Sequence, residues 1–409
     1  MRKINAELDN KMLSVDDALK SVLSGVKKLN YEEISIAQAA NRTLAKDLTS
    51  RLTQPPTDVS AMDGYAVRIE DLKIIPATLN QIGESAAGRS FKGKIQSGQT
   101  VRIFTGAPIP DGADTVIIQE NTEKLDNKII VKQKTSSGNY IRKAGQDFKI
   151  GQTLIKAGTR LNSRNIALAA AMNIPWLQVI RKPQVAILST GDELVLPGEE
   201  IKPNQIISSN SLGLAVLVES NGGVAINLGI AKDNLKSLKD IVAQITSIDM
   251  LVTIGGASVG DYDLVKSALA DEGLDITFNR VAMRPGKPLI FGKIHGKPML
   301  GLPGNPVSAG VTASLFLVPA INKMLGLKTP ISITENAILG CDIDKNDNRQ
   351  DYLRAKMSIN SSEELIVTPF DRQDSSKLAN YANAHCLILR EPFSNALSKG
   401  EIVRIIRLD

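Results

Sequence analysis

The chain has 409 residues, of which 43% are hydrophobic and 22% charged, and its formal net charge is +6 at pH 7. This length predicts about two to four domains, and the composition is typical of folded globular proteins rather than disordered ones. The modest charge and the small number of aromatic rings (one Trp, six Tyr and eight Phe) disfavour nucleic acid as a partner.

The first predicted element is an amphipathic helix that begins after Ser14. In "VDDALKSVLSGVKKL" the apolar residues recur at the i, i+3, i+4, i+7 spacing of one helix face. The residues before it lack the continuous apolar core of a secretory signal, and no stretch approaches the roughly 18 apolar residues of a membrane span. We therefore expect a cytoplasmic protein with no membrane partner.

Residues 49–142 are predicted to form an inserted, mostly β domain. Short apolar runs such as "TVRIF", "TVIIQE" and "KIIVKQ" alternate here with turn-rich segments such as "GAPIPDGAD", which is typical of short strands. A second helix is predicted in "NSRNIALAAAMNI" at 162–174. We expect it to pack with the first helix in a discontinuous linker domain built from residues 1–48 and 143–178.

Residues 179–328 are predicted to form an α/β domain with a parallel sheet. Strand-like runs ("VAILS", "VAINLGI", "DMLVTIGG") alternate with helix-like segments ("NSLGLAVLVESNGG", "NLKSLKDIVAQIT", "DYDLVKSALADEG"), as in parallel strands joined by helices. A hairpin, "PLIFGK" and "KPMLGL", then leads into a helix with Asn305 as its cap and Pro306 at its first position. Short strands over 329–409 predict a terminal β domain.

Three glycine-containing loops follow strands of the α/β domain: "STGDEL" at 189–194, "GGASVGDYD" at 255–263 and "LPGNPVS" at 302–308. Carboxyl ends of parallel strands meet at one sheet edge, where helix N-termini expose N–H donors. Gly255 and Gly260 have the spacing of a phosphate loop, although Asp261 and Tyr262 replace the Lys and Ser/Thr of a nucleotide-hydrolysing loop. A single glycine turn is more often only a turn, but three at one edge indicate a ligand pocket.

Charged residues of both signs accompany these loops. The segment "FNRVAMRPGKPLIFGK" contains four basic residues, Arg280, Arg284, Lys287 and Lys293. They either bind an anion together or are charged residues scattered over the surface. Acidic residues occur in turn-like contexts at Asp58, Asp63, Asp147, Glu193, Asp233 and Asp263. Mg²⁺ binds a few carboxylates and bridges them to substrate phosphates, so acidic and basic side chains can bind the same phosphorylated ligand. Taken singly, each acidic residue is more often a helix cap or a surface residue.

Other chemistries are disfavoured by residue counts. Cys341 and Cys386 lack the spacing of metal ligands, so we expect reduced structural thiols. Only two histidines occur, His295 and His385, and His295 sits in the turn-like segment "KIHGK". These counts disfavour both histidine-based nucleophilic catalysis and a multi-histidine zinc site.

Six ordered motifs carry a resemblance to a known family. "DVSAMDGYAVR", "TGAPIPDGAD", "STGDEL", "GGASVGDYD", "RPGKP" and "LPGNPVS" resemble the molybdopterin molybdenumtransferase family, known as MoeA in bacteria, and the gephyrin E domain. The resemblance runs over nearly the whole chain. It implies a homodimer with a discontinuous linker domain, an inserted β domain, an α/β molybdopterin-binding domain and a C-terminal β barrel. It also implies that adenylylated molybdopterin and molybdate yield molybdenum cofactor and AMP, with Mg²⁺ as cofactor.

The resemblance assigns roles to individual residues. It implies catalytic positions at Asp58, Thr105, Asp147, Glu193, Asp233, Asp263, Arg280 and Arg284, of which Glu193 and Asp233 are the candidate Mg²⁺ ligands. Asp58, Thr105 and Asp147 belong to the inserted domain or its border and would approach across the dimer. The substrate-binding positions are Gly255, Gly256, Ser258, Gly260 and Asp263 in one loop and Pro303, Gly304, Asn305 and Pro306 in another.

The molybdate site would combine the basic segment with the terminal domain. The residues that match are Arg284, Lys287, Ser308, Arg354, Ser375 and Ser376. Arg284 replaces a common lysine of the family, and a guanidinium differs from an ammonium in geometry.

Two rival functions stay open at this point. A molybdopterin adenylyltransferase shares the α/β domain, but its loop favours "TGGTG" where this chain has "IGGASVG". A gephyrin-like scaffold is the other alternative. Expected partners besides a second copy of the chain are a molybdopterin adenylyltransferase and acceptor apoenzymes.

Overall fold

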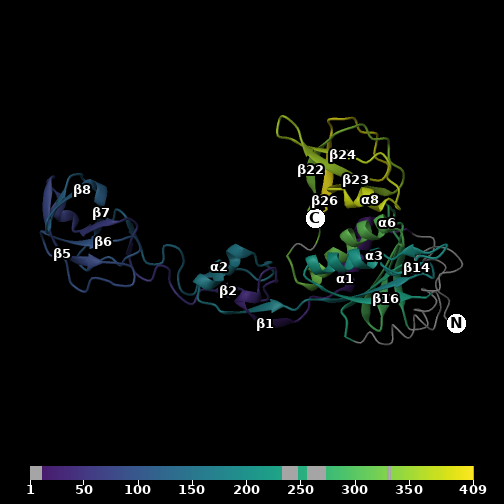
Figure 1. The fold of residues 1–409 in the computed structure, drawn as a ribbon, viewed down its shortest axis with the longest axis horizontal. Helices are drawn as coiled ribbons and strands as arrows, with labels where there is room; N and C mark the ends of the chain where they lie inside the picture. The colour runs from purple at the N-terminus through teal and green to yellow at the C-terminus, as the bar shows by residue number, and fades with distance from the viewer. Residues whose placement is uncertain (1–11, 233–246, 256–272, 329–330, 332, 409) are drawn as a thin grey trace.

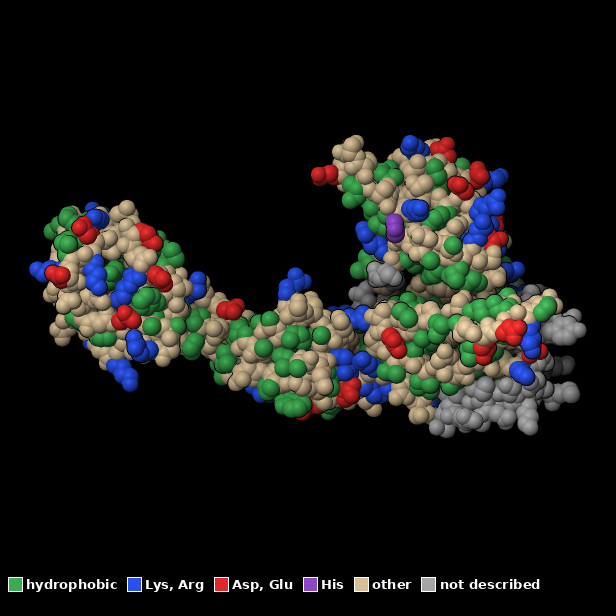
Figure 2. Space-filling model, in the orientation of Figure 1, with side chains coloured by type: hydrophobic (Ala, Val, Ile, Leu, Met, Phe, Trp, Pro, Cys, Tyr) green, Lys and Arg blue, Asp and Glu red, His purple; other side chains and the backbone are tan. Residues whose placement is uncertain are grey.

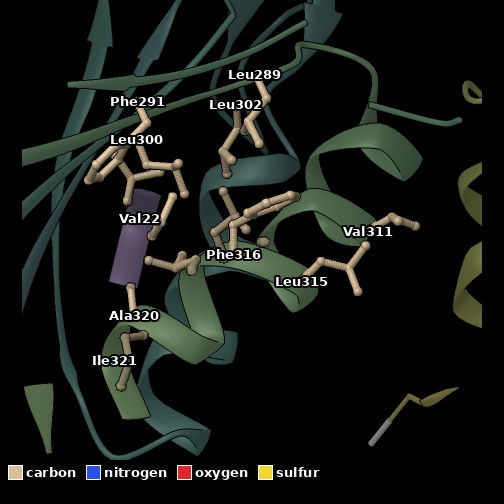
Figure 3. Packing of buried hydrophobic residues seen from close by; sticks show 14 of the residues in the cluster. Val22, Leu289, Phe291, Leu300, Leu302, Val311, Leu315, Phe316, Ala320 and Ile321 are labelled. Atoms are coloured by element: carbon tan, nitrogen blue, oxygen red, sulfur yellow. The ribbon is translucent and has the colours of Figure 1, made fainter. Parts of the chain in front are cut away.

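Helix α1 (Val15–Gly25) begins where the sequence predicts it. Ser14 is its N-cap, and the Ser14 hydroxyl accepts the backbone N–H of Asp17 at 3.1 Å. In the computed structural model, which describes residues 12–232, 247–255, 273–328, 331 and 333–408, this helix packs in the core of the α/β domain. Figure 3 shows Val22 close to Phe291 and Phe316 in that core. The expected packing of the first helix against the second is therefore wrong, because periodicity identifies the buried face but not its partner.

The linker domain joins two separated pieces of chain around one core. Strand β1 (Tyr31–Ser35) pairs antiparallel with β12 (Trp176–Ile180), and β2 (Leu48–Thr49) pairs with β11 (Thr153–Ile155). A 3₁₀ turn, η1 (Ile36–Gln38), follows β1. Helix α2 (Ser163–Ala171) starts with a capping box between Asn162 and Asn165. Leu44 and Phe148 share this core with Leu177, so the discontinuous arrangement holds.

The inserted domain is a curved six-stranded sheet at one end of the molecule (Figure 1). Its order is β7-β4-β6-β5-β9-β8. The bounds are β4 (Gly64–Val67), β5 (Ala77–Ser85), β6 (Gln99–Ile103), β7 (Thr115–Ile118), β8 (Thr122–Leu125) and β9 (Lys128–Val131), with the 3₁₀ helices η2 (Ile69–Leu72) and η3 (Gln119–Asn121). Strands β3 (Val59–Ser60) and β10 (Ile141–Arg142) pair where the chain enters and leaves. We call this two-stranded crossing, residues 54–60 and 141–148, the neck.

The α/β domain is built on a mixed sheet of order β16-β13-β17-β21-β20-β18. The first four strands are parallel, and β20 and β18 run antiparallel to their neighbours. The bounds are β13 (Gln184–Thr190), β16 (Val224–Ala231), β17 (Met250–Ile254), β18 (Asp275–Arg280), β20 (Pro288–Ile294) and β21 (Lys297–Leu302). A small parallel pair, β14 (Leu194–Val195) and β15 (Ile206–Ile207), lies beside it. The predicted helices at 234–246 and 261–273 fall outside the described residues, apart from Gly273.

One face of this sheet is covered by α1, α3 (Asn210–Ser220) and a long helix. The long helix comprises α6 (Pro306–Thr312), a π-helical turn η4 (Ala313–Leu317) and α7 (Val318–Met324). Its length and composition would allow it to cross a membrane, but 72% of its most apolar window is buried, as in a core helix. Figure 3 shows Phe316 from this helix beneath Leu302 of β21, and Ile321 belongs to the same core further along the helix.

The C-terminal strands close into a five-stranded barrel. Strand β23 pairs with both β24 and β25, which completes the circuit β23-β24-β22-β26-β25. The bounds are β22 (Glu335–Leu339), β23 (Gln350–Ile359), β24 (Leu365–Pro369), β25 (Cys386–Arg390) and β26 (Ile402–Arg407), with the short helix α8 (Leu378–Ala382). Strand β19 (Met283–Arg284) of the α/β domain pairs with β23 and links the two domains. The predicted fold class is confirmed, while the residue boundaries given for the four domains stay a prediction.

Candidate functional site

The carboxyl ends of four parallel strands meet at one edge of the α/β sheet. Ser189 of β13 pairs with Ile254 of β17, which in turn pairs with Leu302 of β21, and Thr190 pairs with Ala231 of β16. The loops that begin at 189, 255 and 302 therefore start side by side, as the sequence predicts. We call this region the carboxyl edge.

Gly255 is required at the start of the second loop. Its φ of +91° lies in the left-handed region, and a Cβ there would come within 2.7 Å of the Thr190 carbonyl oxygen. The Gly255 N–H donates to the Leu302 carbonyl at 3.1 Å, which ties the second loop to the third. The other predicted residues of this loop, Gly256, Ser258, Gly260 and Asp263, lie outside the described residues, as does Asp233.

The third loop is held by side chains from two neighbouring elements. The Asn210 amide, at the start of α3, donates to the Gly304 carbonyl at 2.7 Å. Asn305 occupies the N-cap position of α6 but makes no capping hydrogen bond; its amide donates to the Ser375 hydroxyl of the barrel at 3.0 Å. The expected capping bond is therefore absent from the described contacts, because Asn305 reaches across the domain boundary instead. Pro306 is the first helical residue, as predicted.

Among the described residues, the two helices that start at the carboxyl edge, α3 and α6, lack a side-chain cap. Ser209 is the N-cap residue of α3, and its hydroxyl makes no capping hydrogen bond either. Backbone N–H groups in the first turn of such a helix need an acceptor, and an anion can supply it. In α6, Pro306 has no N–H and the Val307 N–H donates to the Ser375 carbonyl, so the described part of the edge offers N–H donors mainly from α3.

Glu193 contributes an exposed carboxylate at this edge. The carboxylate folds back over Gly191, where a Cβ would come within 2.5 Å of Glu193 Oε2. Across the described residues no group of three or more His, Cys, Asp or Glu side chains is placed to hold a metal ion. Mg²⁺ commonly uses only one or two carboxylates together with substrate phosphates, so the single exposed carboxylate of Glu193 fits that mode.

Arg284 is engaged by the barrel. Its guanidinium forms a two-pronged ion pair with Asp351, with Nε 2.7 Å from Asp351 Oδ1, and its Nη1 and Nη2 also lie 3.2 Å from Asp347 and Asn346. The hydrogen bonds to Asp351 raise the pKa of Arg284. This pairing joins residues about 67 positions apart, which sequence spacing alone does not reveal. Lys287, three residues later, is exposed, and Arg280 is half-buried.

Arg354 is the most deeply buried of the predicted anion ligands, with 2% of its surface exposed. Its Nη1 donates to the Tyr352 carbonyl at 3.1 Å, whereas Nη2 is buried without a hydrogen-bond partner among the described atoms. Burial lowers the pKa of Arg354 to about 10, against the opposing effects of Asp351 and Asp374. A buried, unsatisfied N–H group is costly, and a bound anion would remove that cost.

Ser375 and Ser308 lie at the same domain boundary. The Ser375 carbonyl accepts the Val307 N–H at 3.2 Å, which places the barrel loop against the first turn of α6, where the next residue is the buried Ser308. Ser376 points to its own loop, since its hydroxyl donates to Asp374 at 2.6 Å.

The three predicted residues of the inserted domain and neck are far from the carboxyl edge of the same chain (Figure 1). Asp58 accepts Lys143 Nζ at 2.8 Å and the Ala144 N–H at 2.9 Å, and these bonds lower its pKa. The N–H and hydroxyl of Thr105 both donate to Asp63. Asp147 is exposed at the neck. Their approach across a dimer stays a prediction.

Three features of the site were not predicted. Asn210, Tyr381 and Asp351 hold or line the region between the α/β domain and the barrel. Only Asn210 had a local signal, because Ser and Asn residues precede an apolar run there.

Comparisons with known proteins cover almost the full chain. Three family models match: the MoeA N-terminal region (domain I and II) over 13–173, the probable molybdopterin binding domain over 186–323, and the MoeA C-terminal region (domain IV) over 336–408. Proteins named molybdopterin molybdenumtransferase from Nostoc and Haemophilus influenzae are each 35% identical, covering 97% and 96% of this chain and 94% and 98% of their own.

Solved structures agree with these matches. A crystal structure of the molybdopterin biosynthesis MoeA protein from Pyrococcus horikoshii has a TM-score of 0.83 and 32% identity, and covers 97% of this chain and 99% of its own. A second structure of that protein has a TM-score of 0.86 at 28% identity. Because three family models match successive parts of the chain and relatives at 35% identity cover nearly all of it, this chain belongs to the MoeA family of molybdopterin molybdenumtransferases.

Proposed function

We propose that this chain inserts molybdenum from molybdate into adenylylated molybdopterin, with release of AMP. The observation that supports it most strongly is the buried Arg354, whose Nη2 lacks a partner among the described atoms. Arg354 interacts electrostatically with Asp374 and Tyr381, and Ser375, next to Asp374, contacts the N-terminus of α6. A small dianion such as molybdate suits a fixed, partly desolvated cation.

The carboxyl edge would hold the phosphates of the other substrate. The uncapped first turn of α3 presents N–H donors, and Gly255 and Gly304 allow the backbone to approach closely. Holding the pterin and molybdate in adjoining sites would make metal insertion effectively intramolecular. Lys287 would add positive charge from the exposed side.

Glu193, together with Asp233, is proposed to hold Mg²⁺. When bound, Mg²⁺ would polarise the phosphoanhydride that links AMP to the pterin. The chain's own part is then to fix the phosphates on backbone donors. We further propose a cytoplasmic homodimer in which Asp58, Thr105 and Asp147 of one subunit complete the site of the other.

A single-turnover assay tests the proposal. Purified protein is mixed with adenylylated molybdopterin and molybdate, with and without Mg²⁺, and both AMP and metal-loaded pterin are measured. We expect Glu193→Gln to lower the rate by about 10²-fold or more, the range for losing an electrostatic catalytic group. Glu200→Gln, an exposed carboxylate seven residues away, is the matched control and should react normally.

The outcomes separate the alternatives. Normal turnover by Glu193→Gln would remove that residue from the site. Adenylylation of unmodified molybdopterin by ATP, with no product in the first assay, would favour the adenylyltransferase.

A further inference from the structure

A cleft of about 240 Å³ lies between the α/β domain and the barrel. Its lining residues come from α3 and α6 of the α/β domain and from the barrel helix α8, and Figure 1 shows α8 beside α6 where the two domains meet. Its apolar lining includes Leu214 and Leu217 of α3, Pro306 and Ala309 of α6, and Leu378 and Tyr381 of α8. We call this cleft the slot. None of its described lining residues is charged.

One end of the slot adjoins the carboxyl edge. Ser209 and Asn210, which start α3, line that end together with Pro306, which starts α6. Asn210 also donates to the Gly304 carbonyl in the third loop, at 2.7 Å. A ligand with its phosphate at the helix N-termini can therefore extend its other end between the two helices.

Two glycines give the slot its shape. A Cβ at Gly310 of α6 would lie 2.5 Å from the Tyr381 ring, so this glycine allows the ring to pack closely on the helix. Gly213 of α3 has the opposite surroundings, since no atom lies within 4 Å of its Cβ position. Glycine inside a helix costs about 1 kcal/mol relative to alanine, and at Gly213 the result is an open space.

Tyr381 forms a fixed wall of the slot. The side chain hydrogen-bonds with Ser314, and burial raises its pKa, so it stays a neutral phenol at physiological pH. Aromatic rings and aliphatic side chains with a few polar groups at one end are the usual lining of sites for flat organic ligands.

We infer that the slot binds a flat nitrogen heterocycle, the ring end of the substrate. This inference rests on the proposed function, whose substrate carries two such rings, the pterin and the adenine. The apolar lining excludes the charged phosphates and molybdate from the slot, so these groups stay at the helix N-termini near Ser209 and Asn210 while the ring lies between the two helices.

Filling the open space tests the inference. AMP and pterin-6-carboxylate serve as separate probes, and their binding to the full-length protein is measured by calorimetry. We expect Gly213→Leu to weaken the probe that uses the slot by about tenfold or more, equivalent to about 1.4 kcal/mol, and Gly213→Ala to have a smaller effect. Val216→Leu is the control, because Val216 is 66% exposed on the same helix and does not line the slot.

Circular dichroism and thermal melting check the fold of each variant. Leucine favours helix more than glycine does, and Gly213 has free space around it, so the variants should fold. Selective loss of AMP binding would assign the adenine to the slot, and selective loss of the pterin probe would assign the pterin. Unchanged binding of both probes, or no binding of either to the unsubstituted protein, would overturn the inference.

The single-turnover assay separates this inference from the proposed function. If Gly213→Leu binds both probes normally while the unsubstituted protein forms AMP and metal-loaded pterin, the slot assignment fails and the function stands. If the unsubstituted protein forms no product, the proposed function fails whatever the slot binds.

Discussion

Two arginines fasten the α/β domain to its neighbours. Arg181, just after the linker strand β12, donates from Nη1 and Nη2 to the two carboxylate oxygens of Asp249 at 2.7 and 2.6 Å. On the other side Arg284 pairs with Asp351 of the barrel. Two-pronged pairs of this kind fix direction as well as distance, so each arginine sets the orientation of one domain against the sheet.

The Arg181–Asp249 pair predicts a pH dependence. Burial alone would raise the pKa of Asp249, but the bonds from Arg181 and the Gln184 N–H outweigh it and lower the pKa. The pair therefore stabilises the folded protein fully at pH values above the pKa of an unfolded-state aspartate, about 3.9. This stabilisation is lost as the pH falls through the lower pKa that Asp249 has in the folded protein. We expect Asp249→Asn to lower the free energy of unfolding by about 1–3 kcal/mol at pH 7. We also expect the free energy of unfolding of this variant, measured by urea unfolding between pH 7 and 3, to fall less steeply with decreasing pH.

Asp275→Asn gives the control for that experiment, since Asp275 is an exposed carboxylate of the same sheet. An Asp249→Asn protein with the same stability and the same acid limb as the parent would show that the pair is energetically neutral.

Helix α1 and helix α3 use glycine in opposite ways. A Cβ on Gly25, the last residue of α1, would lie 2.5 Å from Cζ of the buried Phe291, so close packing of helix on strand depends on the missing side chain. Gly213 of α3 borders open space. Helix α1 is therefore closely packed against the core at Gly25, whereas helix α3 has unfilled space next to Gly213.

The same substitution should therefore change stability in opposite directions. We expect Gly25→Ala to destabilise the protein by about 1–3 kcal/mol through overpacking, and Gly213→Ala to stabilise it by about 0.4–1 kcal/mol by restricting the unfolded chain. Urea unfolding followed by circular dichroism measures both. Equal effects from the two variants would contradict this account of the packing.

Local patterns predicted most of these elements but few of their partners. The Ser14 start of α1 and the meeting of three loops at the carboxyl edge followed from helix capping and from the geometry of parallel strands. The sequence did not predict that α1 packs in the core of the α/β domain, because an amphipathic pattern shows which face of a helix is buried but not which element packs against it. Arg284 and Asn305 were identified as site residues, but their contacts with Asp351 and Ser375 depend on how the barrel docks.

The elongated chain cannot complete its proposed site alone. Figure 1 shows the inserted domain at the opposite end from the carboxyl edge, with the linker domain between them. If Thr105 acts on the substrate bound by another subunit, two inactive variants should complement each other. This makes the dimer proposal testable without a structure of the complex.

Mixing Thr105→Ala with Glu193→Gln tests that arrangement. After subunit exchange we expect up to about one quarter of the parent activity, because half of the dimers are mixed and each symmetric pair then keeps one intact site. Mixing either variant with itself is the control. Activity no higher than the sum of the two separate variants, with exchange verified by differently tagged subunits, would rule out a site shared between subunits.

The neck has a mechanical consequence. The inserted domain is attached to the rest of the chain by two segments only among the described residues. These segments are joined by the β3–β10 pair, by the Gln54–Phe148 bridge and by the Lys143–Asp58 ion pair. Because that domain extends far from its attachment, a small rotation at the neck moves its distal end through a long arc. In the proposed homodimer, rotation at the neck would therefore decide where the far end of the inserted domain meets the other subunit, and the torsional stiffness of the neck would set how often that contact forms.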